Sequence, residues 1–331
     1  MNGILVVMEQ RPQNGRPSWN RLSWEALAAG RELAVQLDQP LFAAVAGNSL
    51  DVLSPDLAGV AVASAFLVQH HLLSDYTADG FTAALDQLIR KIDPAFVIFP
   101  HTYQVRDFAP ALAAEFGEAL IADVIAVHFE NEVPLFVRQL LQGKLNADYR
   151  HNGEGPCFVS VQAGAFRADA LPQGSSTVET FVPHLGSEQI RNQPGERFRA
   201  SEQTVDLASA PLIVSVGRGI KEKDNIPIVE ELAQALGAEL AASRPICDNG
   251  WLPMERQVGS SGQTVSPKLY LAVGISGAIQ HLVGMKGAKA VVAINKDAEA
   301  PIFEVADYGI VGDLFEVVPA LTAAVRKVKT G

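Results

Sequence analysis

Leu212-Ile-Val-Ser-Val-Gly-Arg-Gly-Ile220 joins a short, β-branched apolar run directly to a turn that carries two glycines. The run Leu212–Val216 predicts a buried strand, because it stands between a proline and a glycine and has almost no polar residues. Apolar residues at three- and four-residue spacings predict a helix over Ile226–Leu236, and Ala238–Ala241 predicts the next strand. This order of strand, turn, helix and strand predicts the start of a parallel sheet with helices on its faces.

The same alternation continues to the end of the chain. The further predicted elements are strands over Leu269–Val273, Ala290–Ile294 and Tyr308–Val311, a helix that begins at Gly277 and a last helix that begins at Leu314. The residues from 209 onward therefore predict one α/β domain.

The first half of the chain shows this alternation too. Its predicted buried strands are Ile4–Met8, Phe42–Ala46, Gly59–Ala63 and Phe96–Phe99, and its predicted helices are Leu22–Leu37, Phe81–Ile92 and Phe108–Phe116. Between residues 121 and 162 the pattern changes to strands in hairpin sequence, an antiparallel addition to the sheet: Val124–Phe129, Pro134–Gln139 and Cys157–Gln162.

The length and one polar stretch predict two domains. A chain of 331 residues exceeds one ordinary core. Gly186–Ala208 is polar and contains Gln193-Pro-Gly-Glu196, which is typical of a linker. We therefore expect an N-terminal domain over residues 1–185, a linker over 186–208 and a C-terminal domain over 209–331. Both domains are expected to be mostly parallel sheets flanked by helices.

Composition excludes several classes of protein. The net charge is −11, which argues against a nucleic-acid partner, because phosphate binding requires a basic surface. Residues 209–331 are nearly neutral, with 12 Lys and Arg against 13 Asp and Glu, so this part can better accommodate a phosphate-bearing ligand. No apolar run reaches the roughly 18 residues of a membrane span. The residues before the first predicted strand do not have the pattern of an export or organelle signal, although a processed precursor would look the same. We expect a cytoplasmic protein in which Cys157 and Cys247 are reduced thiols.

The loop Ser215–Ile220 follows the first strand of the C-terminal domain. Its glycines allow close approach of a ligand, and Arg218 offers a planar, permanently charged phosphate donor. Position 222 is Glu222 where the usual dinucleotide fingerprint has a third glycine, so the nicotinamide-type motif is absent. Taken alone, this loop is as typical of a tight turn as of a binding site.

Two further loops carry polar residues after predicted strands. In Gly274-Ile-Ser-Gly-Ala-Ile-Gln-His281, Ser276 is placed to cap a helix whose free N–H groups favour an anion, although this loop taken alone is more typical of a capped helix without a ligand. Ser243–Gln263 is long, irregular and rich in turn residues, and loops of this length inside a domain are usually functional or disordered. The seven histidines are scattered without metal-ligand spacing, so we expect no metal site.

Together these stretches resemble the alpha subunit of electron-transfer flavoproteins. The residues that carry the resemblance are Val273–His281, Ile294-Asn-Lys-Asp-Ala-Glu-Ala-Pro-Ile-Phe303, Val305-Ala-Asp-Tyr-Gly-Ile-Val-Gly-Asp-Leu-Phe315, Ser243-Arg244 and Gln257-Val-Gly259. The match is close from about Leu212 to Val318 and looser before it, where Thr102-Tyr-Gln-Val-Arg-Asp-Phe-Ala-Pro110 is the clearest part.

The resemblance implies a Rossmann-like C-terminal domain that binds one FAD. It implies that Arg218, Ser243, Ser276 and Gln280 line the phosphate and ribityl region, and that Asn295 and Asp313-Leu314 meet the adenosine end. It further places Arg244 against the isoalloxazine and His281 at the pyrimidine side of the ring. The remaining residues implied to bind FAD are Val258, Gly259, Ser260, Ser261, Gly277, Ala278 and Ile279. A fixed guanidinium beside the flavin favours its reduced anion and raises its potential.

The sequence departs from the commonest family pattern after Gly259. Many members have Gln-Thr-Gly-Lys there, and this chain has Ser260-Ser-Gly-Gln263. Ser261 can still present a hydroxyl to the flavin N5, so Arg244, Ser261 and His281 are the residues expected to tune the flavin. The amide expected at position 260 and the charge expected at position 263 are lost.

The resemblance implies an electron carrier rather than a self-sufficient enzyme. This chain would be the alpha subunit of a heterodimer whose beta subunit binds AMP. The heterodimer would accept electrons from flavin dehydrogenases, such as the acyl-CoA dehydrogenases of fatty acid β-oxidation, and pass them to a quinone oxidoreductase or another acceptor. An alternative within the family is a bifurcating flavoprotein whose beta subunit holds a second FAD and oxidises NADH. A flavoenzyme acting on a small substrate and a nucleotide-binding sensor without redox function are the alternatives from other classes.

Overall fold

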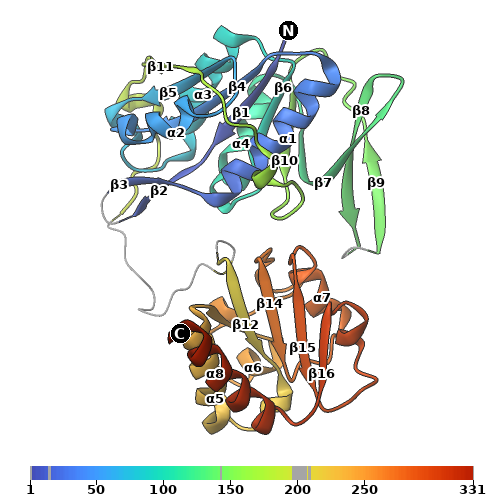
Figure 1. Cartoon of the computed structure of the whole chain (residues 1–331). Helices are drawn as coiled ribbons and strands as arrows, with labels where there is room; N and C mark the ends of the chain where they lie inside the picture. The colour runs from blue at the N-terminus through green and yellow to red at the C-terminus, as the bar shows by residue number, and fades with distance from the viewer. Residues whose placement is uncertain (1, 14–15, 142–143, 196–206, 208–209, 331) are drawn as a thin grey trace. The chain divides into compact units, whose positions relative to one another are not determined.

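The chain divides into two compact units, residues 1–198 and residues 199–331. The computed structural model describes residues 2–13, 16–141, 144–195, 207 and 210–330 (Figure 1). The predicted linker over Gly186–Ala208 lies partly outside the described residues, so the domain limits stay a prediction. Among the described residues no helix has the length and apolar character to cross a membrane.

Within the described part of the first unit, nine strands form one sheet in the order β11-β5-β4-β1-β6-β10-β7-β8-β9. Its strands are β1 (Ile4–Met8), β4 (Leu41–Gly47), β5 (Ser64–Gln69), β6 (Phe96–Pro100), β7 (Leu120–Glu130), β8 (Val133–Leu140), β9 (Leu145–Tyr149), β10 (Cys157–Val161) and β11 (Thr177–Phe181). A separate hairpin pairs β2 (Gln10–Gln13) with β3 (Arg16–Trp19). The helices are α1 (Arg21–Leu37), α2 (Ser54–Ala58), α3 (Ala78–Ile92) and α4 (Tyr103–Glu115).

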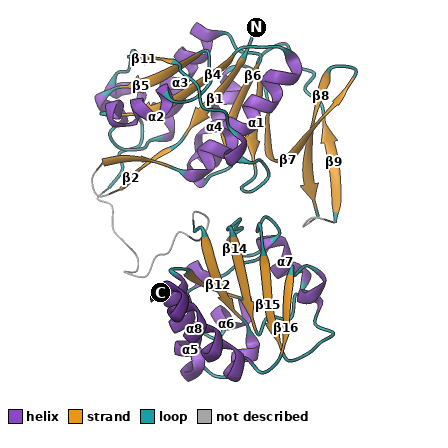
Figure 2. Cartoon of the chain, viewed as in Figure 1, coloured by secondary structure: helices purple, strands orange, loops and turns teal. Residues whose placement is uncertain are grey.

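The first seven strands in this order are parallel, and β8 and β9 add an antiparallel extension. One apolar core packs α1 and α2 on one face of the sheet, and a second core packs α3 and α4 on the other. The mostly parallel α/β architecture expected from the sequence is therefore confirmed for this unit (Figure 2).

Two strand predictions in this unit are wrong. Gly59–Ala63 carries the chain from α2 back to the sheet, and the strand β5 begins only at Ser64; Val62 is buried there as a core contact, which explains the apolar run. The sequence predicts an antiparallel hairpin strand over Cys157–Gln162, but β10 runs parallel between β6 and β7. All five residues of β10 are buried, as in a strand covered on both faces.

Over the described part of the second unit, five parallel strands form a sheet in the order β13-β12-β14-β15-β16. The strands are β12 (Leu212–Val216), β13 (Glu239–Ala242), β14 (Leu269–Val273), β15 (Val291–Asn295) and β16 (Tyr308–Val311). The helices are α5 (Ile226–Leu236), α6 (Arg244–Asp248), α7 (Ile279–Met285) and α8 (Leu314–Thr330). Counted along the chain the strand order is 2-1-3-4-5, a doubly wound arrangement whose order reverses between β12 and β14.

Helices cover both faces of this sheet. One core joins the sheet to α5, α6 and α8, and the other joins it to α7 and the segment before β14 (Figure 2). Gly237, with φ of +71°, ends α5 in the left-handed conformation that glycine adopts without strain. The second unit therefore contains its own parallel sheet with helices on both faces, as the alternation of strands and helices in the sequence predicts.

Candidate functional site

The loops that follow the five parallel strands of the second unit all lie at one edge of the sheet, named the carboxyl edge. The segment Gln257–Gln263 joins them, because Val258 N–H donates to Ala242 O at the end of β13. The residues expected to bind FAD all lie in these loops or border them: Arg218, Ser243, Arg244, Val258, Gly259, Ser260, Ser261, Ser276, Gly277, Ala278, Ile279, Gln280, His281, Asn295, Asp313 and Leu314.

Three glycines bring the loops after β12 and β14 together, backbone against backbone, where the strand order reverses. Gly217 N–H donates to Val273 O at 2.8 Å, and Gly219 N–H donates to Gly274 O at 3.0 Å. A Cβ on Gly217 would lie 2.4 Å from Gly274 O, and one on Gly219 would lie 2.7 Å from Gly274 Cα. The sequence leaves open whether the loop after β12 is a tight turn or a binding site, and the structure shows that Gly217 and Gly219 permit close contact with a second loop.

The turn Ser276–Gln280 presents a run of backbone N–H groups. None of its N–H groups has an acceptor among the residues that the structure describes. Gly277, with φ of +87°, shapes this turn, and Ile302 N–H holds it by donating to Ser276 O at 3.1 Å. Successive free N–H groups of this kind form a concave donor surface that suits a phosphate or a carbonyl oxygen.

The expected capping role of Ser276 is wrong. Helix α7 begins at Ile279 with Ala278 as its N-cap residue, and no side chain caps it. The reason is the left-handed Gly277, which turns the chain once more before the helix starts. Ser276 is exposed in the turn, and its hydroxyl makes no capping bond to α7.

The segment Gln257–Gln263 packs against the start of α7. Ser260 N–H donates to Gln280 O at 2.7 Å, and a Cβ on Gly284 would lie 2.3 Å from Gly259 N, so the two backbones touch. Gln257, which is 1% exposed, donates from Nε2 to Ser261 Oγ at 2.9 Å. This bond orients the hydroxyl that is expected from the sequence to face the flavin N5, while Ser261 itself is exposed.

His281 lies under this segment, 6% exposed, with Nε2 at 2.8 Å from Tyr270 Oη. Burial lowers the pKa of His281 to about 4, and the backbone of Val258 opposes that shift. Nδ1 is buried and no acceptor meets it in hydrogen-bond geometry among the described residues. Gln257 Oε1 is likewise buried without a described partner. Buried orphan atoms of this kind are costly, so their presence at the carboxyl edge is consistent with a ligand that pairs with them.

The low pKa of His281 predicts an acid-sensitive domain. An unfolded histidine takes up a proton near pH 6.5 and the folded one only near pH 4, so the unfolded state binds more protons between these values. The free energy of unfolding should therefore fall as pH drops through this window, by about 2 kcal/mol from this group between pH 7 and pH 5. Urea unfolding at the two pH values should show that the free energy of unfolding falls less in His281→Gln than in the wild type. An equal fall in both proteins would contradict the assignment.

Two arginines supply positive charge at the carboxyl edge. Arg218 opens the turn after β12 and makes no ion pair with the residues that the structure describes. Arg244 is the first residue of α6, and its side chain is 66% exposed and pairs through Nε with Asp248 Oδ2 at 3.1 Å. Arg218 is thus positioned for a phosphate without losing an internal partner, whereas Arg244 would share its charge with Asp248.

The residues expected at the adenosine end have structural roles in the loops. Asn295 Nδ2 donates to Ile275 O at 2.9 Å, and its Oδ1 accepts from Asp297 N–H at 3.1 Å. Asp313 Oδ1 accepts from Phe315 N–H at 2.9 Å at the start of α8, and Leu314 is buried against the Gly274 loop. These contacts fix the loops after β15 and β16. A ligand would therefore bind to the hydrogen-bonding positions of Asn295 and Asp313 that these contacts leave open.

The sequence interpretation missed the roles of two buried residues. Tyr270 contacts His281, and Gln257 contacts Ser261. Tyr270 lies within an apolar strand, where a tyrosine is usually a packing residue. The available signal was the hydroxyl itself, because a fully buried tyrosine in a central strand requires a polar partner. Gln257 gave a similar signal, because its amide stands two residues before Gly259 in the predicted loop.

The carboxyl edge thus combines a run of free N–H groups, an unpaired guanidinium and buried orphan polar atoms beside an apolar core, all within the described residues. These groups define a doubly wound domain of the class that binds a phosphate-bearing cofactor with a flat polar ring at the reversal of strand order. The donor set fits FAD, because the diphosphate suits the N–H groups and Arg218, and the polar edge of the ring suits His281 and Gln257.

Comparison with known proteins agrees with this class. Residues 206–286 match the model of the electron transfer flavoprotein FAD-binding domain, and residues 4–184 match that of the electron transfer flavoprotein domain. The chain is 37% identical over 98% of both chains to an electron transfer flavoprotein subunit alpha of Thermoanaerobacterium thermosaccharolyticum. It is 38% identical over 91% of both chains to that of Bacillus subtilis. A Protein FixB of Clostridium saccharobutylicum is 34% identical over 98% of this chain and 97% of its own.

The chain belongs to the electron transfer flavoprotein alpha-subunit family. The resemblance drawn from the sequence is therefore confirmed, and with it the presence of a flavin-binding domain in the C-terminal part of the chain.

Proposed function

We propose that this chain holds one FAD at the carboxyl edge of its C-terminal sheet and passes electrons between partner proteins as the alpha subunit of a heterodimer. The observation that carries this proposal is the turn Ser276–Gln280, whose N–H groups have no acceptor in the described chain and which is followed directly by His281 with its orphan Nδ1. When bound, FAD would supply reversible one- and two-electron chemistry, and the residues of this chain hold and tune it.

The proposed roles follow from the contacts of each residue. Arg218 and the Ser276–Gln280 N–H groups hold the diphosphate, with Ser243 beside them. Ser261, oriented by Gln257, donates to the ring, and Arg244 places positive charge near it. Val258, Gly259 and Ser260 shape the segment that shields His281 from water. Asn295, Asp313 and Leu314 fix the loops at the adenosine end.

The proposed partner is the electron-transfer flavoprotein beta subunit, which carries AMP, or a second FAD in a bifurcating complex. The proposed donors are flavin dehydrogenases such as acyl-CoA dehydrogenases of fatty acid β-oxidation, and the proposed acceptor is a quinone oxidoreductase or another redox protein. The proposed compartment is the cytoplasm. Relatives whose printed name is subunit alpha support the heterodimer, because such a name implies a second kind of subunit.

Purification from the native source tests the proposal. A tag on this chain should retain one other protein in equal amount, with one FAD per heterodimer and one AMP. Two FAD per heterodimer with NADH oxidation would identify the bifurcating form instead. A monodisperse, fully yellow monomer expressed without a partner would contradict the heterodimer, and a colourless heterodimer would contradict the flavin carrier.

Arg244→Ala is expected to lower the flavin midpoint potential by about 40–80 mV. A unit charge in contact with the ring is worth several kcal/mol at an effective dielectric near 20, but Arg244 is 66% exposed, and solvent screening reduces this to about 1–2 kcal/mol. Because Arg244 shares its charge with Asp248, Asp248→Asn should shift the potential upward. Arg244→Lys should restore part of the loss, since it keeps the charge without the planar contact.

Stepwise anaerobic reduction of the purified complex measures these potentials. Arg326→Ala is the matched control: Arg326 is also an exposed arginine that contacts a carboxylate, Glu231, on a helix. It lies 12 residues along α8 from the carboxyl edge, a distance of about 18 Å at 1.5 Å per residue. Equal potentials in wild type, Arg244→Ala and Arg326→Ala would remove Arg244 from the tuning of the flavin.

A further inference from the structure

Lys221 occupies a strained turn at the carboxyl edge, in the loop after β12. Its φ of +68° and ψ of −52° belong to the rare form of γ-turn, which Glu222 N–H closes by donating to Ile220 O at 2.9 Å. Asp38 and Asp93, which also have positive φ, differ from it, because their ψ values of 48° and 52° are those of ordinary left-handed helix ends. The backbone of Lys221 is therefore in a conformation that glycine alone adopts without cost.

The surrounding contacts enforce this turn. Ile220 is fully buried in the core that joins the sheet to α5, and its carbonyl oxygen also accepts from Asn225 Nδ2 at 3.0 Å. Lys221 N–H donates to Arg218 O at 3.0 Å, so the strained residue and the arginine proposed to hold phosphate belong to one hydrogen-bonded turn. A glycine would fit this backbone without strain. The presence of a lysine instead indicates that its side chain has a use.

The side chain of Lys221 reaches the first turn of α8. Its Nζ lies 4.8 Å from the centroid of the Phe315 ring, and Lys221 is exposed and forms no ion pair with the residues that the structure describes. Phe315 is the second residue of α8, and its N–H donates to Asp313 Oδ1 at 2.9 Å. The helix dipole disfavours a cation near a helix N-terminus, so the contact with the ring is made against a second local cost.

The contact between Lys221 and Phe315 joins two loops that the proposed function assigns to different parts of FAD. Arg218, in the loop after β12, is assigned to the diphosphate, and Asp313, at the start of α8, is assigned to the adenosine end. A dinucleotide touches both loops at once. Its apparent affinity falls when the loops move independently, because the arrangement that binds it is then populated for only part of the time.

We propose that Lys221 is a positioning residue that ties the Arg218 turn to the start of α8 and so holds the two loops at the spacing that a dinucleotide requires. This inference rests on the proposed function. The strained γ-turn directs the side chain to Phe315, and Lys221 acts through the two loops rather than by touching the cofactor. A ligand that reaches only one loop gains nothing from the tie, so Lys221 favours FAD over FMN, which lacks the adenosine half.

Urea unfolding of the full chain without flavin separates the strain from the tie. Lys221→Gly should have a higher urea midpoint than Lys221→Ala, because both variants lose the side chain and only glycine relieves the backbone. Lys221→Ala and Phe315→Leu should each lower the midpoint. The double variant should lower it by less than the sum of the two, since both single variants break the same contact. Equal midpoints for the glycine and alanine variants, or full additivity in the double variant, would overturn the proposal.

The second readout is the flavin affinity of the complex after its flavin has been removed. Lys221→Ala and Lys221→Gly should both weaken FAD binding about three- to fivefold, the equivalent of one exposed cation–π contact, although their urea midpoints differ. The affinity for FMN should stay nearly unchanged. Lys221→Arg keeps a cation over the ring and should bind FAD nearly as tightly as the wild type.

Lys91→Ala is the matched control for these affinities. Lys91 is also an exposed lysine over an aromatic ring, that of Phe181, but it lies in the first unit. An FAD affinity that follows the urea midpoints, an equal loss for FAD and FMN, or an equal loss in Lys91→Ala would overturn the positioning role of Lys221. If the wild-type complex binds no FAD, the proposed function fails and this role fails with it, while the urea midpoints still show whether Lys221 is tied to Phe315.

Discussion

Gly277→Ala should weaken FAD binding about a hundredfold and lower the free energy of unfolding of the C-terminal domain by roughly 2–4 kcal/mol. A Cβ on Gly277 would lie 2.2 Å from Ile302 N and 2.6 Å from Ile302 Cα. These are backbone atoms that cannot rotate away, and the φ of +87° adds strain for any side chain. The turn would have to open, and its N–H groups would no longer converge. Flavin titration and urea unfolding measure the two effects.

Gly250→Ala is the matched control for this prediction. Gly250 has a φ of +66° in the same domain, but a Cβ there would meet no atom within 4 Å. It therefore shows the cost of a side chain at positive φ without a clash, about 1 kcal/mol. If Gly277→Ala bound FAD as tightly as Gly250→Ala, the turn would not be part of the binding site.

Glu9→Ala should lower the free energy of unfolding of the N-terminal domain by about 2–4 kcal/mol. Glu9 is 6% exposed, accepts from Asn20 Nδ2 at 2.7 Å, and accepts from the hydroxyl of Thr102. Asn20 and Thr102 are the N-cap residues of α1 and α4, so one carboxylate orients the caps of two helices. Its loss would leave both caps without this partner and a buried space beside them.

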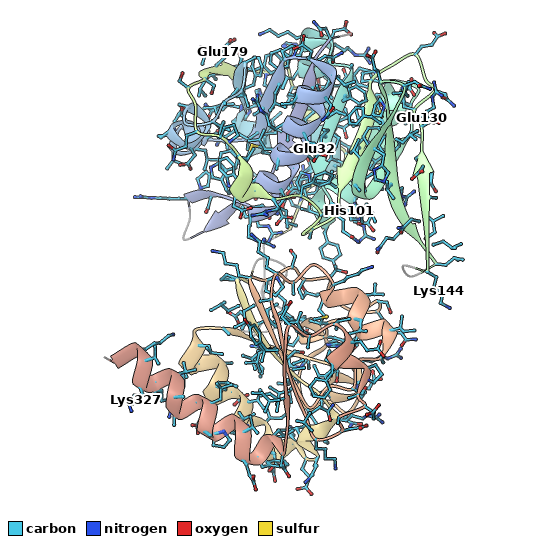
Figure 3. All side chains as sticks on the ribbon, turned by 45° about the vertical axis from the view of Figure 1, so that its right-hand side comes forward. Glu32, His101, Glu130, Lys144, Glu179 and Lys327 are labelled. Atoms are coloured by element: carbon cyan, nitrogen blue, oxygen red, sulfur yellow. The ribbon has the colours of Figure 1, made fainter. Side chains whose placement is uncertain are left out.

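Thermal unfolding by calorimetry should show the lower stability of Glu9→Ala in the transition of the N-terminal domain. Glu32→Ala is the control, because Glu32 is exposed on α1, outside this network (Figure 3). Equal transitions for both variants would mean that Glu9 does not organise the two helix starts. Flavin content should remain unchanged in either variant, since neither residue belongs to the C-terminal domain.

The sequence predicts well those elements whose pattern is set by local residues. The helix over Ile226–Leu236 and the strands Leu212–Val216, Leu269–Val273 and Tyr308–Val311 have the predicted bounds, because glycine, proline and polar residues mark their ends. The strand predicted over Gly59–Ala63 is wrong for the opposite reason. Its apolar residues pack into the core from a connecting segment, and the local sequence pattern does not distinguish such a segment from a strand. The direction of β10 depends on pairing with distant strands, which no local pattern contains.

The candidate site shows the same division. The loops that carry it could be predicted, since parallel strands bring their following loops to one edge. The pairing of His281 with Tyr270, and of Gln257 with Ser261, could not, because each depends on how the folded loops bring side chains together. The use of Gly217 and Gly219 to pack one loop on another also depends on tertiary contact. The individual FAD contacts remain predictions.

Hydrogen–deuterium exchange of the purified heterodimer, with and without FAD, tests the central claim most directly. FAD should slow exchange of the amides of Ser276–Gln280 and of the segment Gln257–Gln263, because the ligand becomes the acceptor for N–H groups of the turn that have none in the described chain. The amides that follow β1 and β6 in the N-terminal sheet should exchange at the same rate in both states. FAD binding that leaves Ser276–Gln280 unprotected, or that protects the N-terminal sheet instead, would contradict a flavin site at the carboxyl edge.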